Sequence, residues 1–356
     1  MKTTRRTFLT AAGTTPLLAR SATAADRRGD WNPIVSENLH NVEYETLRWL
    51  KQLGLKHAVF QGTDHVDASG KGYWTKDDVL YHKSKCDAAG VELVSMMIPI
   101  GLYTSARFGR PGRDEEIENV IRTIQATGEA GVRTMEWRFW PDFYWDHRVG
   151  YYRLEGRGGA SLKAFDYSRV ADRGPFPEVG EVSESEMWER FLYFTKPIVE
   201  AAEKADVQLT MHPNDPPVRN MRGAARIFHH TDELRRLLRE VPSRYNGITF
   251  CQGTITEMGV NVLEDIHYFA SRDRIKLVHF RSVRGTVPKY REVFVDEGDI
   301  DMLEAMKAYR DAGFNGPFVS DHTPRVEGDS GWGHIGRTFT HGYIRGLVQA
   351  VKGRDS

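Results

Sequence analysis

The 356-residue sequence has little of several features that mark other classes of protein. It contains only two cysteines, Cys86 and Cys251, so no framework of disulfides holds the fold together. Lysine and arginine number 49, aspartate and glutamate also number 49, and no long run of one sign occurs. This balance argues against nucleic acid or a membrane surface as a partner. No G-x-G-x-x-G follows the first expected strand, so a dinucleotide-binding fold has no support.

The N-terminal residues have the pattern of an export signal. Arg5 and Arg6 precede a mildly apolar run, Phe8–Ala19, which is too short and too weakly apolar to span a membrane. The small residues Ala22-Thr23-Ala24 then provide a cleavage site. The arginine pair, followed by Thr-Phe-Leu, resembles a twin-arginine signal. We therefore expect residues 1–24 to be a signal peptide that directs the protein to the periplasm.

Eight short strand-like segments alternate with helical patterns along the rest of the chain. They cover residues 33–35, 57–61, 91–98, 132–139, 207–212, 247–252, 275–281 and 316–322. Alternation of strands with helices implies parallel strands joined by crossover connections. Eight such units favour a closed (β/α)8 barrel, the TIM barrel, over an open sheet. We expect residues 25–356 to form this barrel as a single domain.

One connection lacks this regular pattern. Residues 140–182, after the fourth expected strand, have no clear periodicity and are rich in aromatic residues and glycine. Loops of this length within a compact domain are usually lids or binding loops, and the aromatic content disfavours disorder. We expect a lid-like insertion over the strand ends. A structural role or a contact within a homo-oligomer is the alternative.

Residue types that bind metal ions stand at the ends of four consecutive expected strands. One strand ends at His212, directly before the break made by Pro213, and the next three end at Cys251, at His279 and at Asp321-His322. Barrel enzymes place their sites at this carboxyl edge. Histidine, cysteine and aspartate are all ligands for divalent metal ions, so the pattern predicts a metal site. A closed structural zinc site is the alternative to a catalytic one.

The sequence resembles the mannonate dehydratase family over essentially the whole chain after the signal, most densely over His212–Arg281. The segments that carry the resemblance are HPNDPP, RGAARIFHHTDELRRLL, NGITFCQGT, KLVHFRSV and GPFVSDH, with a weaker similarity in WPDFYW and LKAFDYSRVAD. Enzymes of this family are metal-dependent (β/α)8 barrels that use Mn²⁺ or Fe²⁺ to dehydrate D-mannonate to 2-keto-3-deoxy-D-gluconate. The resemblance implies that a divalent ion, Mn²⁺ before Fe²⁺, is bound by His212, Cys251, His279 and Asp321.

This dehydration also needs groups that move protons. A base takes the proton from C2, next to the carboxylate, and an acid protonates the departing 3-hydroxyl, while a cation neutralises the charge that develops. His322 adjoins Asp321 and has an ordinary pKa close to the working pH. Arg281 follows His279 by two residues, so it faces the same side of the strand and can pair with a carboxylate. We expect both to be catalytic, with mere support of the metal by His322 as the alternative.

The sequence departs from the family's pattern at the positions of the acid and base. Asp321-His322-Thr323 stands where the family has Asp-His-Gly, and Trp332 stands where the family has a tyrosine implicated in proton transfer. Tyr144 takes the place of an acidic residue, and His147-Arg148 takes the place of a Thr/Arg pair. We expect Trp332, Tyr144 and Arg148 to contact the substrate, with Trp332 as an apolar wall against the sugar. We also expect weak or absent turnover of D-mannonate.

Three functions fit the sequence. The first is a metal-dependent lyase, a hydro-lyase that dehydrates a small sugar acid. The second is a metal-dependent isomerase, epimerase or other lyase on the same barrel, since one metal-stabilised enediolate serves all of these reactions. The third is a non-catalytic carbohydrate-binding protein that has lost its proton-transfer groups.

Overall fold

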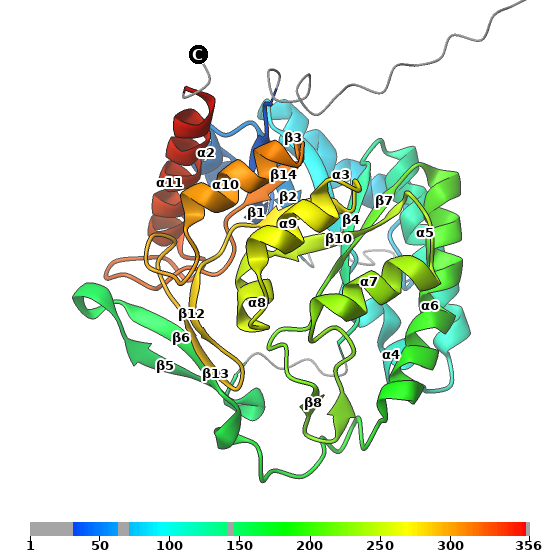
Figure 1. The fold of residues 1–356 in the computed structure, drawn as a ribbon. Helices are drawn as coiled ribbons and strands as arrows, with labels where there is room; N and C mark the ends of the chain where they lie inside the picture. Colours follow the sequence, from blue (N-terminus) through cyan, green and yellow to red (C-terminus); the bar gives the residue numbers. More distant parts are fainter. Residues whose placement is uncertain (1–30, 63–70, 141–145, 354–356) are drawn as a thin grey trace, which may run out of the picture.

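The computed structural model describes residues 31–62, 71–140 and 146–353. Eight parallel strands close into a barrel in the order β1-β14-β11-β10-β7-β4-β3-β2 (Figure 1). These strands are β1 (Ile34–Leu39), β2 (His57–Phe60), β3 (Glu92–Met97), β4 (Thr134–Arg138), β7 (Gln208–His212), β10 (Asn246–Cys251), β11 (Ile275–His279) and β14 (Pro317–Val319). The predicted (β/α)8 barrel is confirmed.

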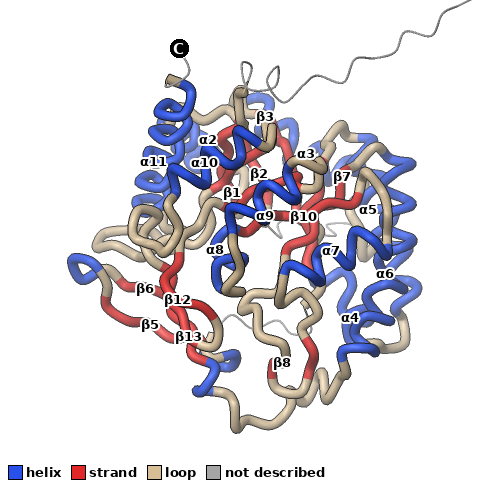
Figure 2. The backbone as a smooth tube through the Cα atoms, viewed as in Figure 1, coloured by secondary structure: helices blue, strands red, loops and turns tan. Residues whose placement is uncertain are grey.

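Helices surround the barrel on its outer side (Figure 2). They are α2 (Tyr44–Gln52), α3 (Lys76–Ala88), α4 (Thr104–Phe108), α5 (Arg113–Glu129), α6 (Glu184–Ala205), α7 (Thr231–Glu240), α8 (Gln252–Glu257), α9 (Val262–Ala270), α10 (Met302–Asp311) and α11 (His334–Lys352). Aromatic stacking joins the two layers, since Trp137 of β4 lies parallel to Phe191 of α6 with ring centroids 5.7 Å apart. Helix α6 begins directly after Ser183, which accepts a hydrogen bond from the backbone N–H of Glu186 at 3.2 Å and so caps the helix.

The first strand is longer than the sequence predicts. It runs to Leu39 rather than ending at Val35, and α2 begins only at Tyr44. The second half of the strand has no apolar pattern in the sequence, because Ser36, Glu37 and Asn38 are polar. All three are nevertheless buried. Glu37 accepts hydrogen bonds from the side chains of Ser320, directly after β14, and of Arg337 in α11. Tertiary partners therefore extend the strand.

The expected irregular insertion is in fact largely a hairpin. Within residues 146–182, β5 (Tyr151–Glu155) and β6 (Ser161–Asp166) pair with each other and then with β12 (Val283–Thr286) and β13 (Lys289–Glu292). The result is a four-stranded antiparallel sheet, β12-β13-β6-β5, which we call the small sheet and which lies at the side of the barrel (Figure 1). Short 3-10 turns flank the hairpin, namely η2 (His147–Val149), η3 (Arg157–Gly159) and η4 (Tyr167–Arg169), while η1 (Ile100–Tyr103) precedes α4.

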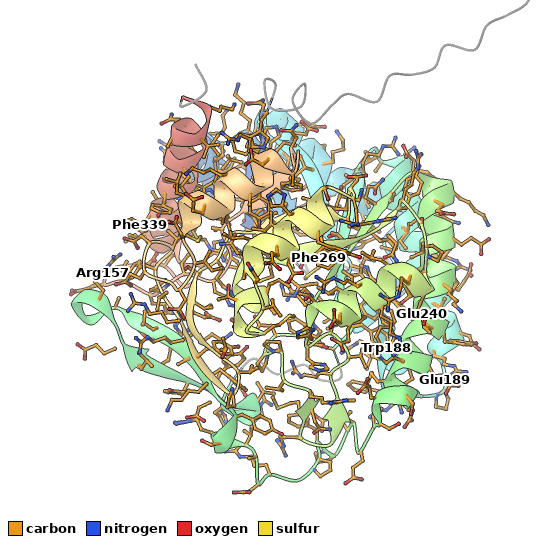
Figure 3. The ribbon with its side chains drawn as sticks, in the orientation of Figure 1. Arg157, Trp188, Glu189, Glu240, Phe269 and Phe339 are labelled. Atoms are coloured by element: carbon orange, nitrogen blue, oxygen red, sulfur yellow. The ribbon has the colours of Figure 1, made fainter. Side chains whose placement is uncertain are left out.

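The tip of this hairpin is fastened to the barrel. Arg157 pairs with Asp296 at 2.9 Å and lies over the ring of Phe294 at 4.2 Å, and Figure 3 shows it near Phe339 of α11. A backbone bridge also joins Ser161 to Arg325. The hairpin is thus a paired part of the fold, and the expectation that this insertion acts as a lid over the strand ends stays a prediction. Both faces of the hairpin carry aromatic or charged residues, so its strands do not show a clear alternation of apolar and polar residues in the sequence.

Two further expectations concern the membrane and the signal. Within the described ranges, no helix has the length and apolar character needed to cross a bilayer. The expected signal peptide, residues 1–24, lies outside the described residues. A two-stranded ribbon, β8 (Asn220–Met221) with β9 (Ala224–Ala225), completes the elements.

Candidate metal centre and active site

The four predicted metal ligands meet at the carboxyl end of the barrel. His212, Cys251 and His279 are the last residues of β7, β10 and β11, and one possible ligand atom from each lies within 4.8 Å of the others. Asp321 follows β14, with Oδ2 3.6 Å from Cys251 Sγ and Oδ1 3.6 Å from His279 Nδ1. All four side chains are buried. Parallel strands in register bring together residues that are up to 109 positions apart in the sequence.

This group of donors fits a divalent metal ion. Both ring nitrogens of His279 are buried and have no hydrogen-bond partner, an arrangement that costs free energy unless another ligand satisfies them. His212 Nδ1 lies 2.7 Å from the backbone carbonyl oxygen of Pro213, which favours a proton on Nδ1 and a lone pair on Nε2. Two imidazoles, one sulfur and one carboxylate are suitable donors for a transition-metal ion. These four side chains therefore fit the divalent metal ion that the sequence predicts.

The charges around these donors also suit a cation. Burial lowers the pKa of His212 to about 3, so its ring is neutral, as metal binding requires. Burial raises the pKa of Asp321, but the neighbouring side chains of His322, His279 and Arg281 outweigh this and hold it well below the usual range. Burial raises the pKa of the Cys251 thiol well above its usual value, so binding of an ion there must displace a proton.

Glu136 of β4 is a charged neighbour that the sequence analysis did not single out. Its Oε2 lies 3.4 Å from His279 Nε2 and accepts a hydrogen bond from Gln61 at 2.7 Å. Burial raises its pKa, but His279 and Arg138 bring it down to about 2, so the carboxylate is ionised. A glutamate within the buried strand Thr134–Arg138 was the available signal, because isolated carboxylates are rarely buried. Its charge adds to the negative potential beside the ligands.

Arg281, which the sequence predicts to be catalytic, lies in a buried cluster of acidic side chains. Its side chain is 0% exposed, and a cluster of acidic side chains surrounds its guanidinium. The hydrogen-bonded atoms are Asp215 Oδ2 at 3.0 Å, Glu257 Oε1 at 2.8 Å, Glu292 Oε1 at 3.2 Å and Thr254 Oγ1 at 3.0 Å. Strand periodicity predicted the side on which Arg281 lies, but not that α8 and the small sheet fill that space with acids. Protein side chains therefore surround the guanidinium, and the expected catalytic role of Arg281 stays a prediction.

The bonds of Arg281 reach both a metal ligand and the candidate proton-transfer group. Thr254, which accepts from Arg281, lies with its Oγ1 3.1 Å from Cys251 Sγ. His322 Nδ1 lies 2.7 Å from Arg281 Nη1 and 2.8 Å from Glu292 Oε1, while its Nε2 lies 3.9 Å from Asp321 Oδ1. The His322 side chain is 38% exposed. Because Nδ1 is engaged by side chains behind it, Nε2 is the ring atom available beside the predicted ligands.

The small sheet builds one wall of the site. Tyr151 of β5 donates a hydrogen bond to Asp215 Oδ1 at 2.6 Å, and Tyr290 of β13 donates to the same oxygen at 3.1 Å. Glu292 of β13 contacts both Arg281 and His322. The sequence did not predict that Asp215, Glu257 and Glu292 belong to the site. They are far apart in the sequence, and their charges come together only in the folded protein.

The three residues predicted to contact the substrate lie in different surroundings. Trp332 lies at the barrel mouth beside His40, which directly follows β1, with ring centroids 4.4 Å apart, and Arg337 lies over its ring at 4.2 Å. Arg148 is half-exposed and its guanidinium is bonded to Asp146 at distances down to 2.6 Å. Its expected contact with the substrate stays a prediction. Tyr144 lies outside the described residues.

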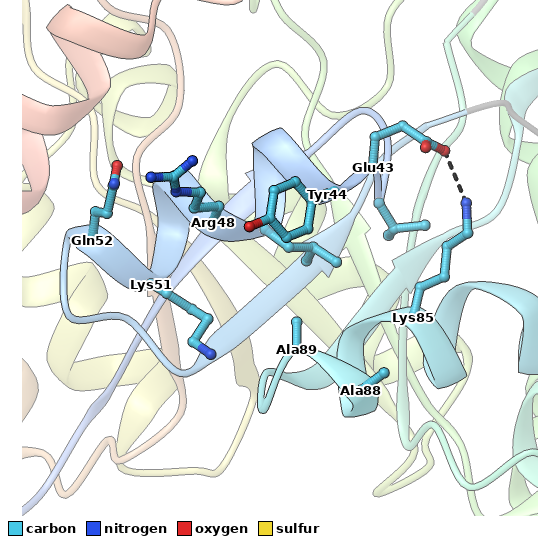
Figure 4. A pocket seen from close by; sticks show the side chains of 10 residues that line it. Glu43, Tyr44, Arg48, Lys51, Gln52, Lys85, Ala88 and Ala89 are labelled. Carbon is cyan, nitrogen blue, oxygen red and sulfur yellow. Dashed lines mark hydrogen bonds and ion pairs between the residues drawn. The ribbon is translucent and has the colours of Figure 1, made fainter.

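A pocket of about 640 Å³ lies elsewhere, on the outside of the barrel between α2 and α3 (Figure 4). An ion pair between Glu43 and Lys85 at 2.9 Å spans one side of it, and Tyr44 is 69% exposed at its rim. Its lining residues come from the two helices rather than from the strand ends. This pocket is therefore separate from the candidate metal centre.

Barrel, donors and flanking histidine together define a class of protein. A (β/α)8 barrel with buried imidazole, thiol and carboxylate donors at its carboxyl end, beside a half-exposed histidine, is a metal-dependent barrel enzyme. Comparison with known proteins identifies the family. Residues 173–355 match the family described as D-mannonate dehydratase (UxuA). The chain belongs to the mannonate dehydratase family and is a hydro-lyase, as the sequence predicts.

Individual relatives agree with this assignment. The chain is 30% identical over 313 residues to a mannonate dehydratase of Thermotoga maritima, covering 78% of this chain and 86% of the relative. It is 28% identical over 333 residues to mannonate dehydratase 2 of Halalkalibacterium halodurans, covering 86% and 95%. The crystal structure of mannonate dehydratase from Streptococcus suis superimposes with a TM-score of 0.81 at 28% identity, covering 91% of this chain and 96% of that one. An L-ribulose 3-epimerase, at 12% identity and a TM-score of 0.57, shares the fold alone.

Proposed function

We propose that this protein dehydrates a sugar acid at a divalent metal ion held by His212, Cys251, His279 and Asp321. The observation that carries the proposal is the fully buried imidazole of His279, whose ring nitrogens make no hydrogen bond and which lies close to the other three donors. Mn²⁺ is the ion we expect, with Fe²⁺ as the alternative, as the resemblance to the family implies. Such an ion neutralises the negative charge that develops on the substrate carboxylate during proton removal.

His322 is the residue that we propose moves a proton. The reaction breaks the C2–H and C3–O bonds; the proton from C2 goes to a base, and the 3-hydroxyl leaves as water after protonation. The enol that remains becomes the 2-keto-3-deoxy acid. Nε2 of His322 lies beside Asp321 and is supported from behind through Nδ1, so it can take or give the proton at a fixed position. Arg281 and Glu292 hold the ring in that orientation.

The identity of the sugar acid is a further part of the proposal. Trp332 stands at the barrel mouth where the family has a tyrosine, and an indole cannot act as an acid or a base. We propose that its ring forms an apolar wall against the sugar. Turnover of D-mannonate should then be weak compared with turnover of a related sugar acid.

Turnover of a panel of sugar acids tests the proposed function. We expect a 2-keto-3-deoxy product from at least one six-carbon acid, loss of the reaction with a chelator and its return with Mn²⁺. Formation of an isomer that retains every oxygen atom would indicate the isomerase or epimerase alternative. Binding of sugar acids without any conversion would indicate a carbohydrate-binding protein. Efficient dehydration of D-mannonate would show that Trp332 did not alter the specificity.

We also propose that the protein is exported through the twin-arginine pathway. The pair Arg5-Arg6, the short apolar run and the small residues before position 25 support this proposal.

A further inference from the structure

One face of the small sheet is directed at the active site. Residues directly opposite each other on neighbouring strands share a face, so the pairings define rows across it. Tyr151, Phe165 and Tyr290 form one row, and the tyrosines of this row bond to Asp215. Two positions further along β5 and β6, Arg153 lies opposite Lys163, whose Nζ is 3.5 Å from Glu292. This is the face that contacts His322.

The next row on this face adds a third cation. Ser161 is two residues before Lys163, so it shares that face, and Arg325 pairs with Ser161 through two backbone hydrogen bonds of 2.9 and 3.0 Å. Arg325 follows Asp321 by four residues and is exposed, as is Arg153. Arg153, Lys163 and Arg325 therefore lie on one face of the small sheet, the face on which Glu292 contacts His322.

These three cations have no acidic side chain that pairs with them alone. Arg153 and Lys163 are directly opposite each other, a like-charge pair that is unfavourable in a sheet. Among the described residues, Lys163 pairs with Glu292, which Arg281 and His322 already share, whereas Arg153 and Arg325 make no ion pair. Burial and the charge of Arg325 both lower the pKa of Arg153.

The acidic groups nearby do not offset these cations. Arg153 and Lys163 line a pocket of about 290 Å³ together with Tyr151, Tyr152, Asp146 and His147. Asp146 in that pocket is bonded to Arg148 through both oxygens. Glu155 shares the face but is exposed, and no ion pair joins it to either arginine among the described residues.

We propose that Arg153, Lys163 and Arg325 form a subsite for a second anionic group on the substrate, at the end remote from the metal-bound carboxylate. The inference rests on the proposed function, since it concerns the far end of the same sugar acid. A carboxylate or a phosphate at C6 suits the subsite, because planar guanidinium groups bind both through paired hydrogen bonds. The preferred substrate class is thus a dianionic sugar acid rather than a simple aldonate.

Binding of inert ligands tests this subsite apart from turnover. The probes are 3-deoxy sugar acids, which lack the leaving hydroxyl, with a hydroxyl, a carboxylate or a phosphate at C6. Calorimetry with the metal-loaded protein should show at least about tenfold tighter binding of one or both dianions than of the C6 alcohol, since charge-assisted hydrogen bonds exceed neutral ones. Whichever dianion gains more identifies the group as carboxylate or phosphate.

Two variants and a control locate the effect. Arg153→Gln and Arg325→Gln should each remove most of that gain while leaving binding of the C6 alcohol and the metal content unchanged. Arg291→Gln is the matched control, because Arg291 is exposed on β13 of the same sheet but points to the opposite face. Equal binding of all three probes, or an equal loss in the control, overturns the subsite. Retention of the dianion preference without any dehydration would refute the proposed function and leave the subsite standing.

Discussion

Among the four proposed ligands, Cys251 most restricts which metal ion the site can bind. A thiolate is a soft ligand, and serine offers no comparable donor near neutral pH. We expect Cys251→Ser to lower the metal content of the purified protein by at least about tenfold, measured by elemental analysis. The matched control is Cys86→Ser, since Cys86 is the only other cysteine and is buried in α3, where burial raises its pKa to about 12. Full occupancy in Cys251→Ser would remove sulfur from the proposed ligand set.

A second prediction for a single residue concerns the proposed proton transfer by His322. His322→Ala should reduce turnover by about 10²–10⁴-fold, the usual contribution of a general acid or base, while metal content stays at the wild-type level. An exposed histidine on α9 gives the control, so His267→Ala should leave both quantities unchanged. Unchanged turnover in His322→Ala would rule out the catalytic role. Loss of the metal would instead assign His322 to support of the ligands.

At the scale of elements, the small sheet converts an insertion into part of the site. Strands β5 and β6 come from the segment after β4, and β12 and β13 from the segment after β11, so two separate connections build one wall. They deliver Tyr151, Tyr290 and Glu292 to the acidic cluster around Arg281. The site therefore depends on docking of this sheet as much as on the barrel.

The docking of β13 gives a prediction about pH. Burial raises the pKa of Glu292, but His322, Lys163 and Arg281 outweigh this and lower it from 4.5 to about 2. A depressed pKa in the folded state means that the stabilisation is complete above about 4.5 and is lost as the pH falls toward about 2. With a chelator present, the free energy of unfolding in urea should fall by up to about 2 kcal/mol more in wild type than in Glu292→Gln between pH 5 and pH 3.

A surface glutamate controls for general acid effects in that experiment. Glu240 ends α7 and its side chain is 44% exposed beside Arg236, so Glu240→Gln should keep the wild-type dependence on pH. The same dependence in Glu292→Gln as in wild type would show that Glu292 does not link the small sheet to the barrel electrostatically.

At the scale of the whole molecule, the proposed export would be connected to metal loading. Copper and zinc bind most nitrogen and sulfur sites more tightly than manganese or iron, so the proposed site is at risk outside the cytoplasm. Folding around the metal before export avoids that competition, and the twin-arginine route carries folded proteins. Replacing Arg5 and Arg6 by lysine should retain the protein in the cytoplasm, measured by fractionation and immunoblotting. Normal export of this variant would show that the N-terminal pattern has been misinterpreted.

The sequence by itself determined the barrel and the group of donors. Strands ending at His212, Cys251 and His279 alternate with helices, and parallel strands in such an order have to present their last residues at one edge. Only the tertiary structure decided that β1 continues through Glu37 and that residues after β4 form a hairpin, because buried polar partners override an apolar pattern. It also decided which side chains surround Arg281. Strand periodicity gives the direction of a side chain, whereas the acids that surround this one come from α8, β13 and the loop after β7, which meet only in the folded protein.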